Sequence, residues 1–206
     1  MNDKANLIFD CDGTLIDSYP AITDAIVRLF RRHGVDCDPT EVRQMALLHY
    51  VDYCVRELAV RGGLDPEALV RERPEVEEDI SLITLMSGAR ELLESGKFNC
   101  FVYTHRGESC GEILNRLGVH DLFTEIVDST RGLKRKPDGE GVNYIIDRYS
   151  LDRTKTCYVG DRALDIECGR NAGVKTVFLR SAGVDIDCSQ ADFTVSSLQE
   201  IMTLPL

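Results

Sequence analysis

Several features that mark secreted, membrane-bound or nucleic-acid-binding proteins are scarce or missing in this chain of 206 residues. No apolar run approaches the roughly 18 residues that a membrane span requires, and the first residues lack the basic and apolar blocks of a signal peptide. Lys and Arg number 24 against 35 Asp and Glu, which gives a formal net charge of −11. This balance argues against binding to a nucleic-acid backbone or to an anionic membrane surface.

Paired cysteine motifs are also missing. The chain has eight cysteines but no Cys-x-x-Cys pair, and several cysteines lie in apolar segments, where the free thiol behaves as a small hydrophobe. We therefore expect a reduced, cytoplasmic protein. With 43% hydrophobic residues, a chain of this length can bury the core of one domain, or of a domain that carries an insertion.

Short apolar segments predict five strands, at residues 5–9, 98–103, 125–127, 156–159 and 174–178. Helical patterns lie between the later strands, at residues 108–117, 141–149 and 163–172. Strands that alternate with helices of this length imply right-handed crossovers and a parallel sheet covered on both faces. The predicted fold class is therefore α/β, with a doubly wound, Rossmann-like core.

A much longer helical stretch separates the first two predicted strands. Its patterns predict helices at residues 21–33, 39–48, 50–61 and 66–85, before a crossover helix at residues 89–94. This is too much helix for one crossover. We therefore expect an inserted all-helical subdomain at residues 17–84, and a Rossmann-like core made of residues 1–16 and 85–206.

Acidic residues follow two of the predicted strands. Asp10 and Asp12 come directly after the first strand, and Asp161 and Asp165 follow the strand at residues 156–159. A simple strand-end turn and a helix N-cap are the alternatives to a functional role. In an open α/β sheet, however, ligands bind beyond the carboxyl ends of the strands, so these acids are expected to converge. Oxygen ligands without a His or Cys grouping favour Mg²⁺.

Two further side chains are expected at the same edge of the sheet. Thr104 follows the strand at residues 98–103, and Lys136 precedes the helix that leads to residues 156–159. A hydroxyl, free amides, an ammonium group and a divalent cation around carboxylates form a site for a dianionic phosphoryl group. The basic residues nearby are read as a solvated run: Arg131, Lys134 and Arg135.

These elements, in this order, resemble the haloacid dehalogenase-like hydrolase superfamily. The matching residues are Asp10-Cys11-Asp12-Gly13-Thr14-Leu15-Ile16-Asp17-Ser18, Thr104, Lys136-Pro137, and Gly160-Asp161 through Asp165. The resemblance covers essentially the whole chain, because the helical insertion sits where one group of the family carries its cap. Within the superfamily, the likeness is greatest to phosphoglycolate-phosphatase-like proteins.

The resemblance implies an Mg²⁺-dependent phosphatase that hydrolyses a small-molecule phosphate monoester, such as a phosphoglycolate-like compound or a sugar phosphate. Asp10 would be the nucleophile that forms an aspartyl-phosphate, and Asp12 the acid and then the base. Thr104 and Lys136 would hold phosphoryl oxygens. Mg²⁺ would be bound by Asp10, by the backbone carbonyl of Asp12 and by Asp161.

Other positions receive weaker assignments. Asp165 is expected to orient waters or the lysine from behind the metal ligands, and His105 and Arg106 are candidate substrate contacts. Two positions depart from the family pattern: Asp138-Gly139 replaces a second proline common after Lys136-Pro137, and Arg162 stands where a small residue is common. The role of Arg162 is open.

Three alternative functions share parts of this pattern. A sugar-phosphate mutase would use the same pair of aspartates, and a non-catalytic phosphate-binding regulatory protein would need the phosphate site without the nucleophile. A carbon–halogen hydrolase is disfavoured, because it would not use the acid–base chemistry of Asp12 in the same way. The expected partner is a small phosphate ester, with no nucleic acid and no membrane, bound by a monomer or homodimer.

Overall fold

The computed structural model describes residues 4–181 and 186–206. The chain divides into two compact units. The first comprises Met1–Asp17 with Leu85–Leu206, and the second is Ser18–Thr84. These bounds differ by one residue from the expected 17–84 insertion, because Asp17 belongs to the short strand β2 (Ile16–Asp17), which pairs with β3 (Thr84–Leu85) where the chain passes between the units.

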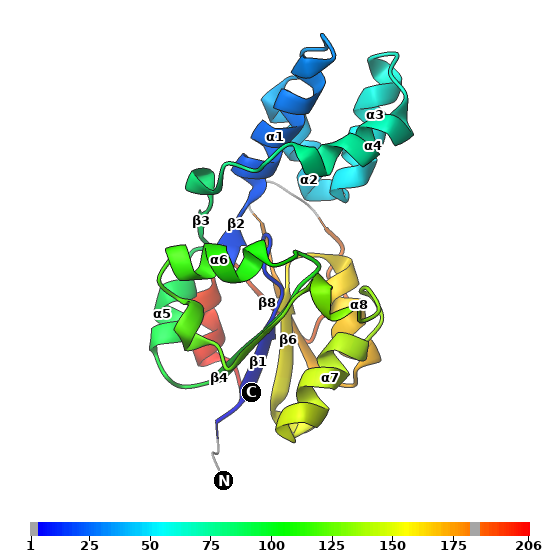
Figure 1. Cartoon of the computed structure of the whole chain (residues 1–206). Helices are drawn as coiled ribbons and strands as arrows, with labels where there is room; N and C mark the ends of the chain where they lie inside the picture. The colour runs from blue at the N-terminus through cyan, green and yellow to red at the C-terminus, as the bar shows by residue number, and fades with distance from the viewer. Residues whose placement is uncertain (1–3, 182–185) are drawn as a thin grey trace. The chain divides into compact units, whose positions relative to one another are not determined.

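A six-stranded sheet forms the centre of the first unit (Figure 1). Its strands are β1 (Asn6–Phe9), β4 (Asn99–Tyr103), β5 (Glu125–Val127), β6 (Thr156–Gly160), β7 (Lys175–Leu179) and β8 (Phe193–Val195). They lie in the order β5-β4-β1-β6-β7-β8, and every neighbouring pair is parallel. The predicted doubly wound α/β fold is confirmed.

Edge strand β8 was not predicted. It has only three residues and its sequence, Phe193-Thr194-Val195, is too short for a periodic signal. Its pairing with β7 makes it a strand, with Phe193 opposite Val177 and Val195 opposite Leu179. A contact between distant segments, rather than a local pattern, therefore defines this edge of the sheet.

Helices cover both faces of the sheet, which explains why the central strands are buried along their whole length and mostly apolar. Every residue of β1 and β6 is buried. In Figure 1, α7 (Glu140–Tyr149) and α8 (Ala163–Asn171) lie on one side of the sheet, and α5 (Ala89–Glu94) and α6 (Ser109–Arg116) on the other. Ile8, Phe101 and Tyr158 belong to the core cluster under α7 and α8.

Strand order reverses next to β1. From β1 the chain continues to β4 and β5 on one side, then returns to β6, which pairs with the other side of β1 and leads on to β7 and β8. The crevice beyond the carboxyl ends of strands at such a reversal is the usual ligand site of a doubly wound sheet. The first residues after β1, β4 and β6 are Asp10, Thr104 and Asp161, respectively.

The second unit is helical and has its own apolar core. It contains α1 (Tyr19–Arg32), α2 (Pro39–Leu48), α3 (Val51–Arg61) and α4 (Pro66–Glu72). Buried residues of its core include Ile26, Phe30 and Val55.

The predicted helix at residues 66–85 was wrong, because α4 ends at Glu72. Pro74 lacks the amide hydrogen that an α-helix needs there, and its ring would clash with the carbonyl of Val70. Short 3₁₀ turns follow instead, at Arg73–Glu75 and Ile80–Leu82. Further 3₁₀ helices in the first unit span His120–Leu122, Ser129–Arg131, Arg153–Lys155 and Leu198–Thr203.

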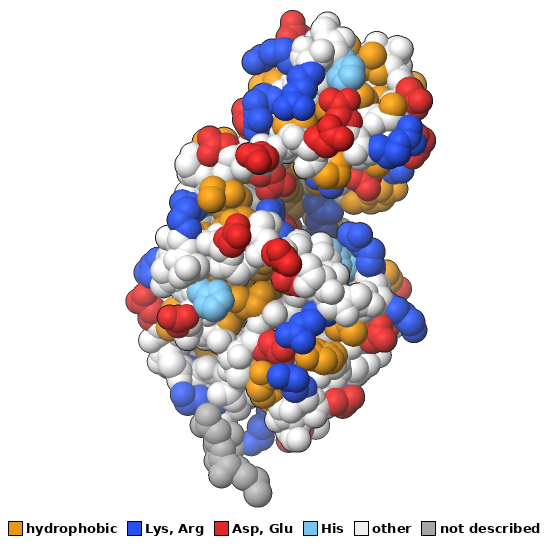
Figure 2. Space-filling model, in the orientation of Figure 1, with side chains coloured by type: hydrophobic (Ala, Val, Ile, Leu, Met, Phe, Trp, Pro, Cys, Tyr) orange, Lys and Arg blue, Asp and Glu red, His pale blue; other side chains and the backbone are white. Residues whose placement is uncertain are grey.

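The surface is charged, and both signs are present. On the face drawn in Figure 2, acidic and basic side chains are interspersed over each unit. Within residues 4–181 and 186–206, no helix combines the length and apolar character needed to cross a bilayer.

Candidate active site

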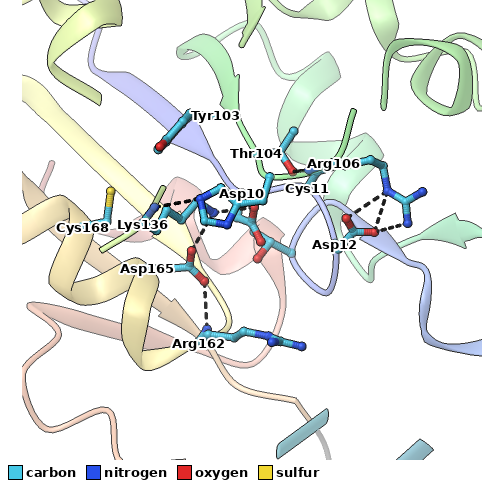
Figure 3. Close-up of polar contacts among 12 residues, drawn as sticks. Asp10, Cys11, Asp12, Tyr103, Thr104, Arg106, Lys136, Arg162, Asp165 and Cys168 are labelled. Carbon is cyan, nitrogen blue, oxygen red and sulfur yellow. Dashed lines mark hydrogen bonds and ion pairs between the residues drawn. The ribbon is translucent and has the colours of Figure 1, made fainter. Parts of the chain in front are cut away.

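Asp10 and Asp12, the two aspartates that follow β1, lie at the start of a tight turn. The carbonyl of Cys11 accepts hydrogen bonds from the backbone N–H groups of Thr14 (3.3 Å), Leu15 (2.9 Å) and Ile16 (3.1 Å). Gly13 has a positive φ of 79°, a conformation that strongly favours glycine. The carboxylate of Asp10, directly before the turn, contacts Lys136, whereas that of Asp12, within the turn, contacts Arg106, as Figure 3 shows.

Lys136 lies between two buried carboxylates. Its Nζ donates to Asp10 Oδ1 at 2.6 Å and to Asp165 Oδ1 at 2.8 Å, and its side chain is 2% exposed. Burial raises the pKa of Asp10 to about 6, although the Lys136 charge opposes the rise. Burial alone would lower the pKa of Lys136, but the charges of Asp10 and Asp165 hold it well above its ordinary value. The geometry therefore keeps a charged ammonium group beside the proposed nucleophile.

Three carboxylates gather at the reversal of strand order. One oxygen each from Asp10, Asp161 and Asp165 lies within 4.8 Å of the other two, and all three residues are buried. Both oxygens of Asp165 are engaged, Oδ1 by Lys136 and Oδ2 by the backbone N–H of Arg162 at 3.1 Å. Buried, oxygen-only donors suit Mg²⁺. Asp165 is a hydrogen-bond partner of the lysine through Oδ1, and the three carboxylates are close enough together that they could hold a metal ion.

The position after β4 presents a buried hydroxyl. Thr104 is 1% exposed, and its Oγ1 accepts from the backbone N–H of Arg106 at 3.1 Å. Because the hydroxyl accepts this bond, its own hydrogen remains available to donate. Thr104 thus fits the donor role predicted for it toward a phosphoryl oxygen.

His105 makes a hydrogen bond to the backbone of Lys136. Its Nε2 accepts from the backbone N–H of Lys136 at 2.8 Å, which places the ring proton on Nδ1. Burial, followed by the charges of Lys136 and Arg135, lowers the pKa of His105 to about 4. The imidazole is therefore neutral near pH 7 and braces the backbone of the residue that contacts Asp10.

Arg106, predicted only as a candidate substrate contact, makes a forked ion pair with Asp12. Its Nε donates to Oδ1 (3.0 Å) and Oδ2 (2.9 Å), and its Nη2 donates to Oδ1 at 2.6 Å. The two residues are 94 positions apart in sequence. No local pattern connects them, so sequence analysis did not predict the pair.

A small recess adjoins the predicted phosphate-binding hydroxyl. It has a volume of about 220 Å³ and is lined by Tyr103, Thr104, His105, Asp128, Ser129, Leu133 and Arg135. These residues come from the ends of β4 and β5 and from the segment before Lys136. The recess is therefore a feature of the first unit alone.

Two supporting contacts had no predicted role. The Thr14 hydroxyl donates to Asp161 Oδ1 at 3.1 Å, and both residues are buried. The thiols of Cys11 and Cys110 meet at a distance of 3.4 Å between their sulfur atoms, which joins the first-motif turn to α6. Thr14 was recognisable as part of the matched motif, but the cysteine contact spans 99 residues and leaves no local signal.

The fold and the site together define a doubly wound α/β protein with a lysine-bridged group of acids at its strand reversal. The model of the haloacid dehalogenase-like hydrolase family matches residues 7–179, and the chain belongs to that family. The predicted superfamily and the predicted hydrolase class are thereby confirmed.

Relatives and solved structures refine this likeness. A phosphoglycolate phosphatase of Vibrio vulnificus (strain CMCP6) is 24% identical over 221 residues, covering 97% of this chain and 95% of the relative. Validoxylamine A 7'-phosphate phosphatase of Streptomyces hygroscopicus subsp. limoneus is 26% identical over 200 residues, with 94% of each chain covered. A crystal structure of a predicted phosphoglycolate phosphatase from Haemophilus somnus 129pt superposes with a TM-score of 0.83 at 20% identity, covering 98% of each chain. The predicted likeness to phosphoglycolate phosphatases is confirmed.

Proposed function

We propose that this protein is an Mg²⁺-dependent phosphatase that hydrolyses a small-molecule phosphate monoester through an aspartyl-phosphate on Asp10. The observation that carries the proposal is the buried contact of Asp10 with Lys136, beside Asp161 and Asp165. A carboxylate held against an ammonium group at a ligand crevice is costly as a structural feature, but it suits attack on a dianionic phosphoryl group.

The reaction takes place in two steps. An oxygen of Asp10 attacks phosphorus, the bond from phosphorus to the ester oxygen breaks, and that oxygen takes a proton from Asp12 and leaves as the alcohol. Water then attacks phosphorus and gives a proton to Asp12. The bond to the Asp10 oxygen breaks, which frees inorganic phosphate and restores the Asp10 carboxylate. One ester and one water yield one alcohol and one phosphate.

Thr104 and Lys136 bind the phosphoryl oxygens in this proposal. The buried hydroxyl of Thr104 has a hydrogen to donate, and the ammonium group of Lys136 already touches Asp10. Donors fixed before the substrate arrives stabilise the transition state without reorganising.

Asp10, the backbone carbonyl of Asp12 and Asp161 would hold Mg²⁺. The Thr14 hydroxyl orients Asp161, and Asp165 holds the lysine rather than the metal. When bound, the cation neutralises charge on the carboxylates and on the phosphoryl oxygens.

The substrate is a small molecule rather than a nucleic acid, in keeping with the net charge of −11. The relatives named above are phosphatases of phosphoglycolate and of validoxylamine A 7'-phosphate, at nearly equal identity. A phosphoglycolate-like or sugar phosphate is therefore the proposed class, with the helical unit acting as a cap that selects among esters.

The decisive experiment compares the wild type with Asp10→Asn in a phosphate-release assay over phosphoglycolate, sugar phosphates and p-nitrophenyl phosphate. We expect the variant to retain its fold by circular dichroism but less than about 1% of the wild-type turnover, because the amide is a poor nucleophile. EDTA should abolish wild-type activity and Mg²⁺ should restore it.

Three outcomes would contradict the proposal: a fully active Asp10→Asn, full activity in metal-free buffer, or no hydrolysis of any ester. A wild type that isomerises sugar phosphates without releasing phosphate would instead indicate a mutase.

A further inference from the structure

The forked ion pair of Asp12 and Arg106 is built more firmly than a surface contact. The side chains of Arg106 and Asp12 are 10% and 29% exposed. Three hydrogen bonds join the guanidinium to the two carboxylate oxygens, at 2.6 to 3.0 Å. Two-oxygen contact by a planar guanidinium fixes the plane of a carboxylate as well as its position, which a lysine cannot do.

Arg106 is itself fixed by its surroundings. Its backbone N–H donates to Thr104 Oγ1 at 3.1 Å, and its carbonyl accepts from the backbone N–H of Ser129 at 3.0 Å. Its Nη1 donates to the hydroxyl of Ser109 at 3.5 Å. The contact between Cys11 and Cys110 holds the turn that carries Asp12 against α6, the helix that begins just after Arg106. Both ends of the fork are therefore anchored in the first unit.

We propose that Arg106 is a positioning residue, which holds the carboxylate of Asp12 in one orientation at the edge of the site and does not itself contact the substrate. The inference rests on the proposed function, in which Asp12 gives a proton to the leaving oxygen. Figure 3 shows the fork on the far side of Asp12 from Lys136, with the guanidinium turned toward Asp12 rather than toward Asp10.

A positioning role and a substrate contact predict different kinetics. A misplaced Asp12 slows proton transfer, so kcat should fall most for alkyl esters, whose leaving oxygen needs the proton. A lost substrate contact would raise KM instead, and would do so most for an ester with a second anionic group. Phosphoglycolate, glycerol 3-phosphate and p-nitrophenyl phosphate distinguish the two cases, because they offer an anionic alkyl, a neutral alkyl and an aryl leaving group.

The experiment uses Arg106→Gln and Arg106→Lys in the full-length protein, each alone and combined with Asp12→Asn. We expect Arg106→Gln to lower kcat on both alkyl esters by about 10- to 100-fold, with a much smaller loss on the aryl ester and little change in KM. Arg106→Lys should fall between Arg106→Gln and the wild type. In the Asp12→Asn background, Arg106→Gln should lower kcat by less than about a further 2-fold, because the carboxylate that Arg106 positions is already absent.

The matched control is Arg90→Gln, which removes another arginine–carboxylate pair of the same unit, with Glu94 on α5. It should leave the kinetic profile unchanged. A crystal structure of Arg106→Gln supplies a readout independent of activity: we expect the Asp12 carboxylate to adopt another orientation.

Equal losses on alkyl and aryl esters would overturn the inference. So would additive losses with Asp12→Asn, an unmoved Asp12 in the variant structure, or a rise in KM confined to phosphoglycolate. Failure of the proposed function is seen separately, as an active Asp10→Asn or an inactive wild type. If the proposed function failed in this way, the ion pair of Arg106 and Asp12 would have no role in catalysis, even if the variant structure showed Asp12 displaced.

Discussion

At the scale of single residues, the position of Lys136 explains how two buried acids coexist. Asp10 and Asp165 are 11% and 1% exposed at their side chains, and the Lys136 ammonium group touches both. Removal of one partner from a buried charge cluster leaves the rest uncompensated. The lysine is therefore both a proposed phosphate ligand and a structural counter-charge.

Lys136→Met should lower the free energy of metal-free unfolding by about 3–5 kcal/mol, because it leaves the buried carboxylates without their cation. Urea unfolding in EDTA measures this loss of stability. Added Mg²⁺ should reduce the difference in unfolding free energy between the variant and the wild type. Lys134→Met is the control, because that lysine is 71% exposed in the same segment. It should change stability by less than about 0.5 kcal/mol. A higher melting temperature in metal-free Lys136→Met than in the wild type would contradict the prediction.

His105 gives the stability a pH dependence with a definite sign. Its folded-state pKa is lowered to about 4, below the usual 6.5, so the unfolded chain binds the proton more readily. The stabilisation from the neutral ring is complete above about pH 6.5 and is lost as the pH falls toward 4.

His105→Gln keeps an acceptor for the Lys136 N–H but cannot titrate. We expect the variant to lose less unfolding free energy than the wild type between pH 7.5 and pH 5 in urea titrations. His120→Gln, which removes an exposed imidazole, is the control and should follow the wild-type curve. Parallel curves for His105→Gln and the wild type would show that the ring is not the titrating group.

At the scale of elements, close packing between the end of β6 and the start of α8 places Asp165 under Lys136. Gly160 is the last residue of β6, and a Cβ added there would lie 2.2 Å from Asp165 Cβ. This distance is far below van der Waals contact, and Asp165 Cβ is not the mobile end of a flexible side chain. Glycine is therefore required for α8 to begin where it does.

Gly160→Ala should destabilise the protein by about 1–3 kcal/mol through overpacking, and should lower turnover because Asp165 and Lys136 must shift. Thermal unfolding and steady-state assays measure the two effects. Gly107→Ala is the control on the segment after β4, because its nearest neighbour would be Ser129 Oγ at 3.7 Å. If Gly160→Ala matched the wild type in both assays, the packing argument would fail.

At the scale of the whole molecule, the two compact units divide the proposed work. All residues of the proposed chemistry belong to the unit made of Met1–Asp17 and Leu85–Leu206. The unit Ser18–Thr84 has its own apolar core and several exposed apolar side chains, among them Leu48, Tyr50 and Val60. We propose that this helical unit selects the substrate and excludes bulk water during transfer.

Replacement of residues 18–84 by a short Gly/Ser linker should preserve slow hydrolysis of p-nitrophenyl phosphate, because the acids and the lysine remain. Selectivity among natural esters should fall by an order of magnitude or more, since a substrate-specific cap is lost. Relative kcat/KM values over a panel of esters measure this, with circular dichroism as the check on folding. A folded core that kept the rank order of the full-length protein would contradict the cap role.

Local pattern determined much of this protein. The apolar runs of β1, β4 and β6 predicted buried strands, and the acids after β1 and β6 followed from strand-end positions that a parallel sheet brings to one edge. The helix α2 was predicted at its observed bounds because Asp38 and Pro39 supply a clear start. The strand–helix alternation likewise implied the doubly wound fold, because periodicity and chain punctuation depend on neighbouring residues alone.

Contacts between distant segments decided the rest. The pairing of Arg106 with Asp12 spans 94 residues, and that of Lys136 with Asp10 spans 126, so no local pattern could assign the partner of either cation. Strand β8 exists through its pairing with β7, and the contact of Asp165 Oδ1 with Lys136 Nζ joins α8 to the segment before α7. A sequence indicates which groups reach an edge of the sheet, but which groups touch there is set by tertiary packing, since hydrogen bonds and ion pairs act over only a few ångströms.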